Sequence, residues 1–255
     1  MAKISCVLIT RDEEKNIAGC LQSASFCDES IVVDSESRDR TRELAAGLGA
    51  KVLVRPFSGF SDQKNYGIRQ ASGDWIFLID ADERVSAELR GEILRAADSS
   101  LADGYLIPRL NDIFGRRMRH GAHAGDTQLR LVRRNKGLFE GAVHERVHCT
   151  GVVSKLKSPL YHRSTESLGA YMKKLNHYTS LEALELSKKG PLDLEKQMKR
   201  KPLLKFLSDM LLKQGIRDGW EGFLFGFLSA YYDFIKRAKA WELSARHDKI
   251  NRSVN

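Results

Sequence analysis

The sequence predicts an α/β fold in which a mixed, mostly parallel sheet has helices on both faces and a helical extension follows at the C-terminus. Two observations lead to this prediction. Short apolar runs alternate with segments of helical periodicity over the first hundred residues, the order typical of parallel strands joined by crossover helices. From residue 168 onward the pattern is helical.

Apolar runs mark four strands in the first eighty residues. The first run, ISCVLIT at residues 4–10, is continuous, as expected of a strand that is buried on both faces of a parallel sheet. The three later runs, at residues 30–34, 51–54 and 75–79, share its β-branched or aromatic character.

A segment of helical spacing follows each run. These segments cover residues 16–25, 39–48, 61–71 and 86–97. Gly49 is expected to end the second helix, because glycine readily adopts the left-handed conformation that follows many helices. Ser86 is expected to cap the fourth, because its hydroxyl accepts a hydrogen bond from a free backbone N–H.

Two further strands are predicted between residues 104 and 162, where the regular alternation stops. They cover residues 105–108 and 128–132, and the loop between them is rich in Gly, Arg and His. This change of pattern separates the regular α/β part of the chain from its C-terminal part.

The remaining residues are helical in pattern. Breaks are expected at residues 190–191 and at Pro202, because proline removes a backbone donor and disfavours helix at the preceding residue. We therefore expect two domains, an α/β domain at residues 1–165 and a basic, aromatic helical extension at residues 166–255.

Composition and charge restrict the class of protein. The chain has 255 residues, of which 42% are hydrophobic, enough for one large α/β core. The net charge is +9, and residues 171–255 hold 17 Lys or Arg against 10 Asp or Glu. A basic C-terminal region favours an anionic partner, either a membrane surface or nucleic acid.

The sequence predicts a cytoplasmic protein. It contains no stretch of 18 uncharged apolar residues, and its first residues lack the apolar core of a secretory signal. The four cysteines form no CxxC pair, so we expect reduced thiols and no zinc site.

Residues 215–243 are rich in aromatic side chains, and Lys236, Arg237 and Lys239 lie among the last of them. Such a helix either docks on the rest of the protein or lies in a membrane interface with its cations toward lipid phosphates. Five of the eleven phenylalanines lie between residues 206 and 234, which favours the lipid interpretation.

Acidic residues follow three of the predicted strands. The segments are TRDEE at residues 10–14, DSESRD at 34–39 and DADE at 80–83. The carboxyl ends of parallel strands meet at the ligand-binding edge of the sheet, so these side chains would repel one another unless a cation lies among them. Oxygen ligands favour Mg²⁺ or Mn²⁺.

Asp80 and Asp82 are the most informative residues of these segments. Alternate residues of an extended segment point the same way, so both carboxylates can face one site. A solvated loop is the usual explanation of an isolated Asp-x-Asp, but the position after a buried strand favours a ligand site. Asp34 is placed to accept a hydrogen bond from a base N–H. Its alternative is a carboxylate at a helix N-terminus, a role for which Asp39 is better placed.

Taken in order, these segments resemble the successive motifs of family 2 glycosyltransferases. The matching segments are residues 9–17, 28–41 and 73–83, then 128–134, 143–145 and the aromatic tail around 218–219. Within the family the chain most resembles the bacterial lipopolysaccharide core β-glucosyltransferase-like branch. The resemblance implies a GT-A fold, a nucleotide-sugar donor, a divalent cation and inversion at the anomeric carbon by single displacement.

The resemblance also implies which residues bind the nucleotide. Thr10, Glu13 and Asp34 would bind the nucleoside, with uridine as the expected base and ribose. Lys64 or Asn65 would add contacts, because their segment SDQKN matches the donor-side helix of the family. For Thr10 and Glu13 the alternative is capping of the first helix.

Nearer the reacting carbon, the resemblance assigns roles to the aspartates. Asp80 would contact ribose or sugar hydroxyls, and Asp82 would hold the metal that bridges the diphosphate. Arg130 is a candidate for neutralising the leaving diphosphate, since a guanidinium holds phosphate through two hydrogen bonds.

The catalytic base must be a carboxylate near the acceptor hydroxyl, on the face opposite the leaving group. The Glu-Asp pair that many family members use is absent, and Val143-His144-Glu145 occupies a comparable stretch. We therefore assign the base to Glu145, with an ion pair to Arg146 as the alternative, and expect His144 on the metal side.

Together these expectations describe a metal-dependent glycosyltransferase, peripheral on the cytoplasmic face of the inner membrane, that acts on a lipopolysaccharide core or another lipid-linked saccharide. One alternative is a nucleotidyltransferase that makes an activated sugar, but no Gly-rich phosphate loop follows the first strand. Another is a nucleic-acid-binding protein, but no such module is recognisable and acidic strand ends would repel a polyanion. We therefore expect no nucleic-acid partner.

Overall fold

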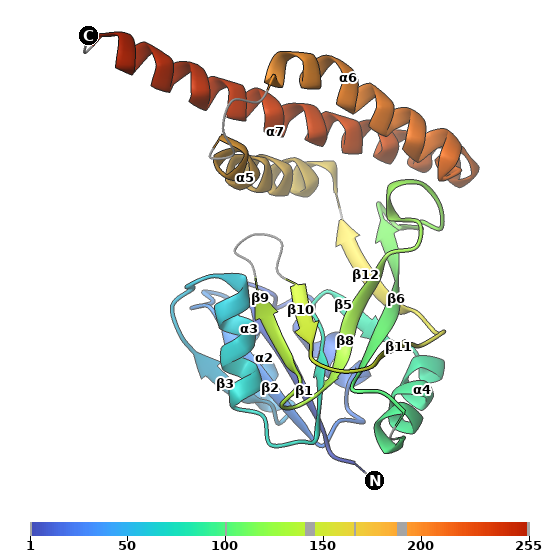
Figure 1. Ribbon diagram of the computed structural model, residues 1–255. Coiled ribbons are helices and arrows are strands. Elements are labelled where there is room, and N and C mark those ends of the chain that lie inside the picture. Colours follow the sequence, from blue (N-terminus) through green and yellow to red (C-terminus); the bar gives the residue numbers. More distant parts are fainter. Residues whose placement is uncertain (1, 100, 141–145, 166, 188–192, 254–255) are drawn as a thin grey trace. The chain divides into compact units, whose positions relative to one another are not determined.

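The computed structural model describes residues 2–99, 101–140, 146–165, 167–187 and 193–253 (Figure 1). The chain divides into two compact units. The first comprises Met1–Leu110 and Gly125–Arg163, and the second comprises Asn111–Ala124 and Ser164–Asn255. The segment at residues 111–124 therefore groups with the C-terminal helices.

The main sheet begins with four parallel strands. They lie in the order β3-β2-β1-β4, and β8 and β6 continue the sheet in antiparallel pairing. These strands are β1 (Ile4–Thr10), β2 (Glu29–Asp34), β3 (Lys51–Val54), β4 (Trp75–Leu78), β6 (Gly104–Ile113) and β8 (Thr127–Arg133). Thr10 pairs with Asp34, so the carboxyl ends of β1 and β2 lie side by side.

Shorter strands complete the first unit. β12 and β5 extend the sheet beyond β6, β11 pairs with β6, and β9 and β10 form a separate antiparallel pair. Their bounds are β5 (Glu83–Val85), β9 (Gly137–Glu140), β10 (Arg146–Cys149), β11 (Val153–Lys155) and β12 (Leu160–Thr165). The sequence did not predict them, because such short segments carry too little periodicity.

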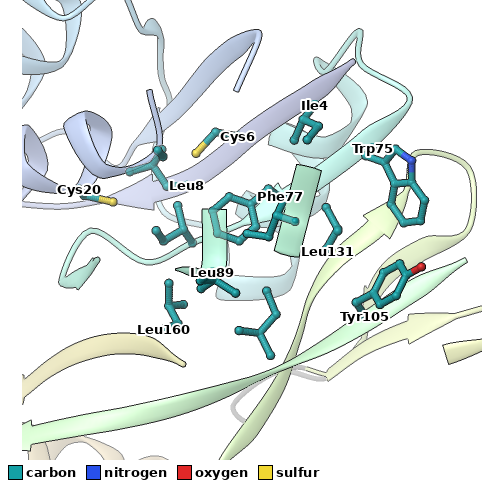
Figure 2. Close-up of a cluster of buried hydrophobic side chains, with 14 of the residues drawn as sticks. Ile4, Cys6, Leu8, Cys20, Trp75, Phe77, Leu89, Tyr105, Leu131 and Leu160 are labelled. Atoms are coloured by element: carbon teal, nitrogen blue, oxygen red, sulfur yellow. The ribbon is translucent and has the colours of Figure 1, made fainter. Parts of the chain in front are cut away.

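The side chains of β1 alternate between two hydrophobic clusters, one on each face of the sheet. Ile4, Cys6 and Leu8 belong to the first cluster, and Val7 belongs to the second. Figure 2 shows the first cluster, with Phe77 at its centre. Burial on both faces is what the continuous apolar run predicts.

Helices cover both faces of the sheet. On the first face lie α1 (Ile17–Ser23), α2 (Thr41–Gly47) and α4 (Ala87–Asp98), and on the second lie α3 (Phe60–Arg69) and the β9–β10 pair. Gly67 of α3 lets the helix approach β1, because a Cβ at this position would lie only 2.6 Å from Val7 Cγ1.

These elements confirm the predicted α/β fold and its mostly parallel sheet. The predicted helix caps are also present. Ser86 Oγ accepts a hydrogen bond from the N–H of Leu89 at 3.1 Å, and Gly49 follows α2 with a φ of 79°. All four cysteines are free, and Cys6 and Cys20 are buried.

The second unit is helical, as expected. Its long helices are α5 (Leu168–Ser187), α6 (Leu194–Leu207) and α7 (Gly219–Ser253), with a π turn at Ser208–Leu212 and a 3-10 turn at Gly215–Asp218 between the last two. The predicted break at Pro202 is wrong, since α6 continues through it. Proline costs one backbone hydrogen bond, and the packing of α6 against α7 keeps the helix intact. The break expected at residues 190–191 lies outside the described residues.

One side of α7 docks within the second unit. Phe225 packs with Met118 in one hydrophobic cluster, and Ala240 packs with Ala183 in another. The docking alternative for the aromatic segment is therefore correct for this side of the helix. Among the helices that the structure describes, none is both long and apolar enough to cross a bilayer.

Candidate active site

A buried carboxylate, Asp34, lies at the carboxyl ends of β1 and β2. Its Oδ2 accepts hydrogen bonds from the hydroxyls of Thr10, at 3.1 Å, and of Ser37. Its Oδ1 accepts one from the N–H of Ser37 at 2.9 Å. The side chain is 0% exposed. The structure thus brings Thr10 and Asp34 together and occupies both oxygens of Asp34 with donors from the protein.

The loops that follow β1 and β2 are tied to each other. The N–H of Asp12 donates to Ser37 Oγ at 2.9 Å, and Asp12 Oδ1 accepts the N–H of Arg38 at 2.7 Å. Asp12 and Glu36 have left-handed φ angles of 55° and 58°. Such angles are costly for residues other than glycine and cluster at functional sites. Hydrogen bonds between the loops offset this cost.

Glu13 lies in the first of these loops. Its N–H donates to Thr41 Oγ1 at 2.7 Å, and its Oε2 accepts from Asn16 Nδ2 at 2.9 Å. Its carbonyl oxygen accepts the N–H of Ile17, the first residue of α1. Glu13 therefore takes part in the start of α1, which was the alternative to nucleoside binding, while its half-buried carboxylate remains at the site.

A second group of charged residues begins with Asp80, just beyond β4. Asp80 Oδ2 lies 2.6 Å from Arg130 Nη2, and its Oδ1 lies 3.5 Å from Lys64 Nζ. Burial raises the pKa of Asp80, but the charges of Arg130 and Lys64 outweigh burial and hold that pKa well below its usual value. Asp80 is therefore ionised and paired.

Glu83 is the fully buried partner of the same arginine. Its Oε1 accepts a hydrogen bond from Arg130 Nη2 at 2.6 Å and lies 3.5 Å from Arg109 Nη1. Burial raises the pKa of Glu83, and Arg130 offsets only part of this effect. Burial lowers the pKa of Arg130, but Asp80 and Glu83 raise it well above its usual value. Basic side chains of the protein thus relieve part of the repulsion between these carboxylates, for which the sequence alone suggested a metal cation.

Asp82 faces His162, a residue that the sequence did not predict at the site. Asp82 Oδ2 lies 3.3 Å from Nε2 of His162. His162 stands in β12 opposite Glu83 of β5, and its segment, LYHRST, carries no motif that would have identified it. The residues expected on the metal side and as the base, His144 and Glu145, lie outside the described residues.

Asp82 and His162 fit a divalent cation as a partial ligand set. Carboxylate oxygen and imidazole nitrogen are both ligands of Mn²⁺-type ions. Among the residues that the structure describes, no group of three or more His, Cys, Asp or Glu is arranged to hold an ion. Two protein ligands leave coordination positions for diphosphate oxygens and water, which is how Mg²⁺ commonly binds at phosphate sites.

A cavity of about 470 Å³ adjoins Asp80 and is lined mostly by polar side chains. Lys64, Arg109, Gln128 and Arg130 contribute to its wall, together with the ring of Phe139. Arg130 Nε is buried and has no hydrogen-bond partner within the described chain. The guanidinium is held at the wall of the cavity by Asp80 and Glu83.

Asn65 acts on this cavity through Phe139. Its Nδ2 donates to the carbonyl oxygen of Phe139, and its Oδ1 accepts the N–H of the same residue, both at 2.9 Å. Phe139 in turn lies under Lys64, whose Nζ is 5.0 Å from the ring centroid. The amide of Asn65 therefore fixes β9 beside Lys64.

The sequence is similar to that of known glycosyltransferases. The model of the family described as Glycosyl transferase family 2 matches residues 5–153. An uncharacterized glycosyltransferase of Rickettsia typhi, RT0209, is 30% identical over 100% of this chain and 92% of its own length. LpsC of Rhizobium meliloti, a lipopolysaccharide core biosynthesis glycosyltransferase, is 29% identical over 97% of this chain and 95% of its own.

Two solved structures share more distant similarity. S. aureus TarS 1–349 in complex with UDP-GlcNAc is 16% identical with a TM-score of 0.47, covering 96% of this chain and 92% of that one. Glucosyl-3-phosphoglycerate synthase from Mycobacterium tuberculosis, in complex with Mn²⁺, UDP and phosphoglyceric acid, is 18% identical with a TM-score of 0.48. It covers 75% of this chain and 80% of that one.

Proposed function

Because the chain belongs to glycosyl transferase family 2, we propose that it transfers a hexose from UDP to a lipopolysaccharide core or another lipid-linked saccharide. That it is a glycosyltransferase follows from the family model and from relatives that match nearly its whole length. Family and strand order together make the fold the expected GT-A type. The family match and the strand order favour sugar transfer over the nucleotidyltransferase and nucleic-acid-binding alternatives.

One observation carries the proposal for the donor: polar residues end three neighbouring parallel strands. Thr10 and Asp34 end β1 and β2, and Asp80 and Asp82 follow β4, which pairs with β1. A nucleotide sugar laid across this edge meets polar groups at both ends, as ligands of parallel sheets commonly do.

In this proposal Thr10, Glu13 and Asp34 form the nucleoside end of the site. Both oxygens of Asp34 already accept hydrogen bonds. Because this side chain is also fully buried, a uracil N–H would reach Asp34 only after the loop around Ser37 moves. Until then Asp34 orders the loop that borders the nucleoside.

The diphosphate end combines the cavity wall with the Asp82–His162 pair. Lys64 and Arg130 line the cavity and would contact diphosphate oxygens, and Asp80, held by Arg130, would accept hydrogen bonds from ribose or sugar hydroxyls. Asp82 and His162 would hold Mg²⁺ or Mn²⁺. When bound, such a cation stabilises the negative charge of the departing diphosphate.

The transfer is proposed to invert the anomeric carbon. The acceptor oxygen forms its bond to C1 while the bond from C1 to the UDP oxygen breaks, and the acceptor proton passes to the base. We assign the base to Glu145 and place His144 on the metal side. Both assignments rest on the sequence, since these residues lie outside the described part of the chain.

The acceptor proposal rests on the similarity to LpsC, which is named for lipopolysaccharide core biosynthesis. A lipid-linked acceptor would bring the enzyme to the cytoplasmic face of the inner membrane. The basic residues 166–255 would then make a peripheral contact with that surface.

A donor screen tests the proposal. Thermal unfolding of the purified chain is measured with UDP-, GDP- and dTDP-hexoses, each with and without Mn²⁺. A ligand that binds only the folded state raises the melting temperature, so UDP-hexose with Mn²⁺ should give the largest rise. Asp82→Asn should lose the Mn²⁺-dependent part of that rise, and the exposed Glu88→Gln should keep it. A larger rise in melting temperature with another nucleotide, or a rise with UDP-hexose that is the same with and without Mn²⁺, would contradict the proposal.

A further inference from the structure

Helix α7 presents an exposed row of aromatic side chains, which we call the aromatic face. Its members recur at intervals of three, four or seven residues and therefore share one side of the helix. They are Trp220, Phe223, Phe227, Tyr231, Phe234 and Trp241. Trp220 is 68% exposed and Phe227 is 55% exposed. From its first to its last member the row extends about 30 Å along the helix.

The opposite side of α7 is the one that docks within the second unit. Phe225, Leu228 and Ala240 are buried there. Arg237 is also buried on this side, and its Nη1 donates to the carbonyl oxygen of Asp233 at 2.8 Å. Docking therefore uses the polar and small residues of α7 as well as two large apolar ones, and it leaves the aromatic face exposed.

Aliphatic side chains at the junction of α6 and α7 extend this surface. They are Leu203, Leu204, Leu207, Leu211, Leu212 and Ile216, all exposed, and we call them the apolar tip. Phe206 of α6 meets Phe223 edge-on with ring centroids 5.7 Å apart, and Trp220 stacks on Phe223 at 5.5 Å. Through Phe206 the aromatic face thus reaches α6, the helix that carries Leu203, Leu204 and Leu207 of the apolar tip. Exposed apolar surfaces of this extent mark interaction sites.

The charges around the apolar tip are almost all positive. Residues 196–217 contain seven Lys or Arg and a single acidic residue, Asp209. Asp209 is buried and already paired with Lys205 at 3.2 Å and Lys213 at 3.0 Å. Exposed cations beside an exposed apolar surface match the interface of an anionic bilayer, where apolar groups enter the acyl boundary and cations meet lipid phosphates.

This charge pattern disfavours a second copy of the chain as the occupant. In a twofold dimer both copies contribute the same surface, so the interface would gather the cations that border both apolar tips. Like charges across an interface cost free energy. A surface of anionic lipids has the opposite sign, and the indole rings of Trp220 and Trp241 suit its headgroup region.

We propose that the aromatic face and the apolar tip bind anionic lipids, with α7 lying in the plane of the membrane. The orientation follows from the one-sided surface, because the buried Asp233 and Arg237 turn toward the rest of the second unit. The lipid-binding surface rests on the proposed function, because a lipid-linked acceptor is what would bring the enzyme to a membrane. It specifies which residues meet the membrane.

Vesicle sedimentation of the full-length chain tests the proposal. Vesicles of phosphatidylcholine alone are compared with vesicles that also contain phosphatidylglycerol. The wild type should sediment with the anionic vesicles, and the double variant Trp220→Ser/Phe227→Ser should partition roughly tenfold or more weakly. Leu101→Ser, at another highly exposed leucine, is the matched control and should bind like the wild type. Lys199→Glu/Lys201→Glu should weaken binding most at low salt.

Tryptophan fluorescence gives a second measurement. Trp75 is fully buried, so quenching by brominated lipids reports on Trp220 and Trp241. Quenching in anionic vesicles supports the proposal, whereas a wild type that stays in the supernatant, or a double variant that binds equally well, overturns it. Concentration-dependent dimers that the double variant abolishes would instead make this surface a self-interface. The thermal shift caused by the donor is measured without vesicles and tests the proposed function separately. The lipid-binding proposal and the proposed function can therefore fail independently of each other.

Discussion

Arg130 Nη2 lies 2.6 Å from Asp80 Oδ2. The two residues come from neighbouring strands of opposite direction, because Asp80 follows the parallel strand β4 and Arg130 belongs to the antiparallel strand β8. Arg130 thus neutralises the charge of Asp80, the first carboxylate of the Asp-x-Asp segment. The two aspartates therefore differ in their surroundings, since Asp82 faces a histidine instead.

Replacing Arg130 should destabilise the protein and abolish transfer. Arg130→Met leaves the buried Glu83 without its closest cation, and breaking a buried pair in this way costs about 3–5 kcal/mol of unfolding free energy. Arg130→Lys keeps the charge but loses the planar fork, so it should be more stable than Arg130→Met and still transfer poorly. Urea unfolding and donor turnover measure the two effects. Arg90→Met, at an exposed arginine of α4, is the control. An Arg130→Met variant as stable as the wild type would mean that the pair is not maintained.

His162→Gln should weaken the response to Mn²⁺. His162 Nε2 lies 3.3 Å from Asp82 Oδ2, so its loss removes one of two side chains placed to hold the ion. We expect the Mn²⁺ concentration for half-maximal activity to rise roughly tenfold or more, with most activity recovered at saturating Mn²⁺. His177→Gln, at an exposed histidine of α5, should leave that concentration unchanged. An unchanged requirement in His162→Gln would place the ion elsewhere.

The parallel strands, and with them much of the site, could be predicted from the sequence. A strand that is buried on both faces appears as a continuous apolar run, and the next polar residue marks its end. Thr10, Asp34 and Asp80 were found in this way. His162 was not, because β5 and β12 are short and their pairing joins segments far apart in the chain.

The charge balance of the site could not be predicted in the same way. The sequence shows acidic residues gathered after strands, which suggested a cation as the means of relieving repulsion. The structure adds Lys64 from α3 and Arg109 and Arg130 from the antiparallel strands. Which cations reach the strand ends depends on the register of β6 and β8, and that register includes an irregularity between Tyr105 and Leu106.

Asn65→Leu should raise the KM for the donor more than it lowers kcat. The substitution removes two hydrogen bonds to the backbone of Phe139 and so releases the wall of the cavity beside Lys64. The loss should also cost roughly 2 kcal/mol of unfolding free energy. Steady-state kinetics and urea unfolding test this, with Gln22→Leu on the exposed side of α1 as the control. A raised KM without loss of stability would indicate that Asn65 contacts the donor directly.

Gly67→Ala should destabilise the first unit. The added Cβ would lie 2.6 Å from Val7 Cγ1 and 3.1 Å from Val33 Cγ2, so α3 must move away from β1. Overpacking of this kind costs about 1–3 kcal/mol. Gly47→Ala meets nothing within 4 Å and should be neutral or slightly stabilising. Adding Val7→Ala to Gly67→Ala should restore part of the lost stability. If the double variant is no more stable than Gly67→Ala alone, another contact is responsible for the loss.

Asp218 should make the stability of the second unit depend on acid pH. Its carboxylate accepts the N–H groups of Arg119 at 3.0 Å and His120 at 2.8 Å, and it lies 2.7 Å from His120 Nδ1. Burial raises the pKa of Asp218, but these hydrogen bonds outweigh burial and lower the pKa below its ordinary value. The stabilisation is therefore complete above the unfolded-state pKa of about 4 and is lost as the pH falls through the folded-state value.

Asp218→Asn removes this acid-sensitive contribution. At neutral pH the variant should lose roughly 1–3 kcal/mol of unfolding free energy, because the amide offers a weaker acceptor to the same donors. As the pH falls, the wild type loses this stabilisation, and the two unfolding free energies should converge once the pH is below the lowered folded-state pKa of Asp218. Urea unfolding at a series of pH values measures the difference, with Glu195→Gln at an exposed site of α6 as the control. Curves for Asp218→Asn and the wild type that stay parallel down to acid pH would show that Asp218 does not hold the 119–120 segment through its charge.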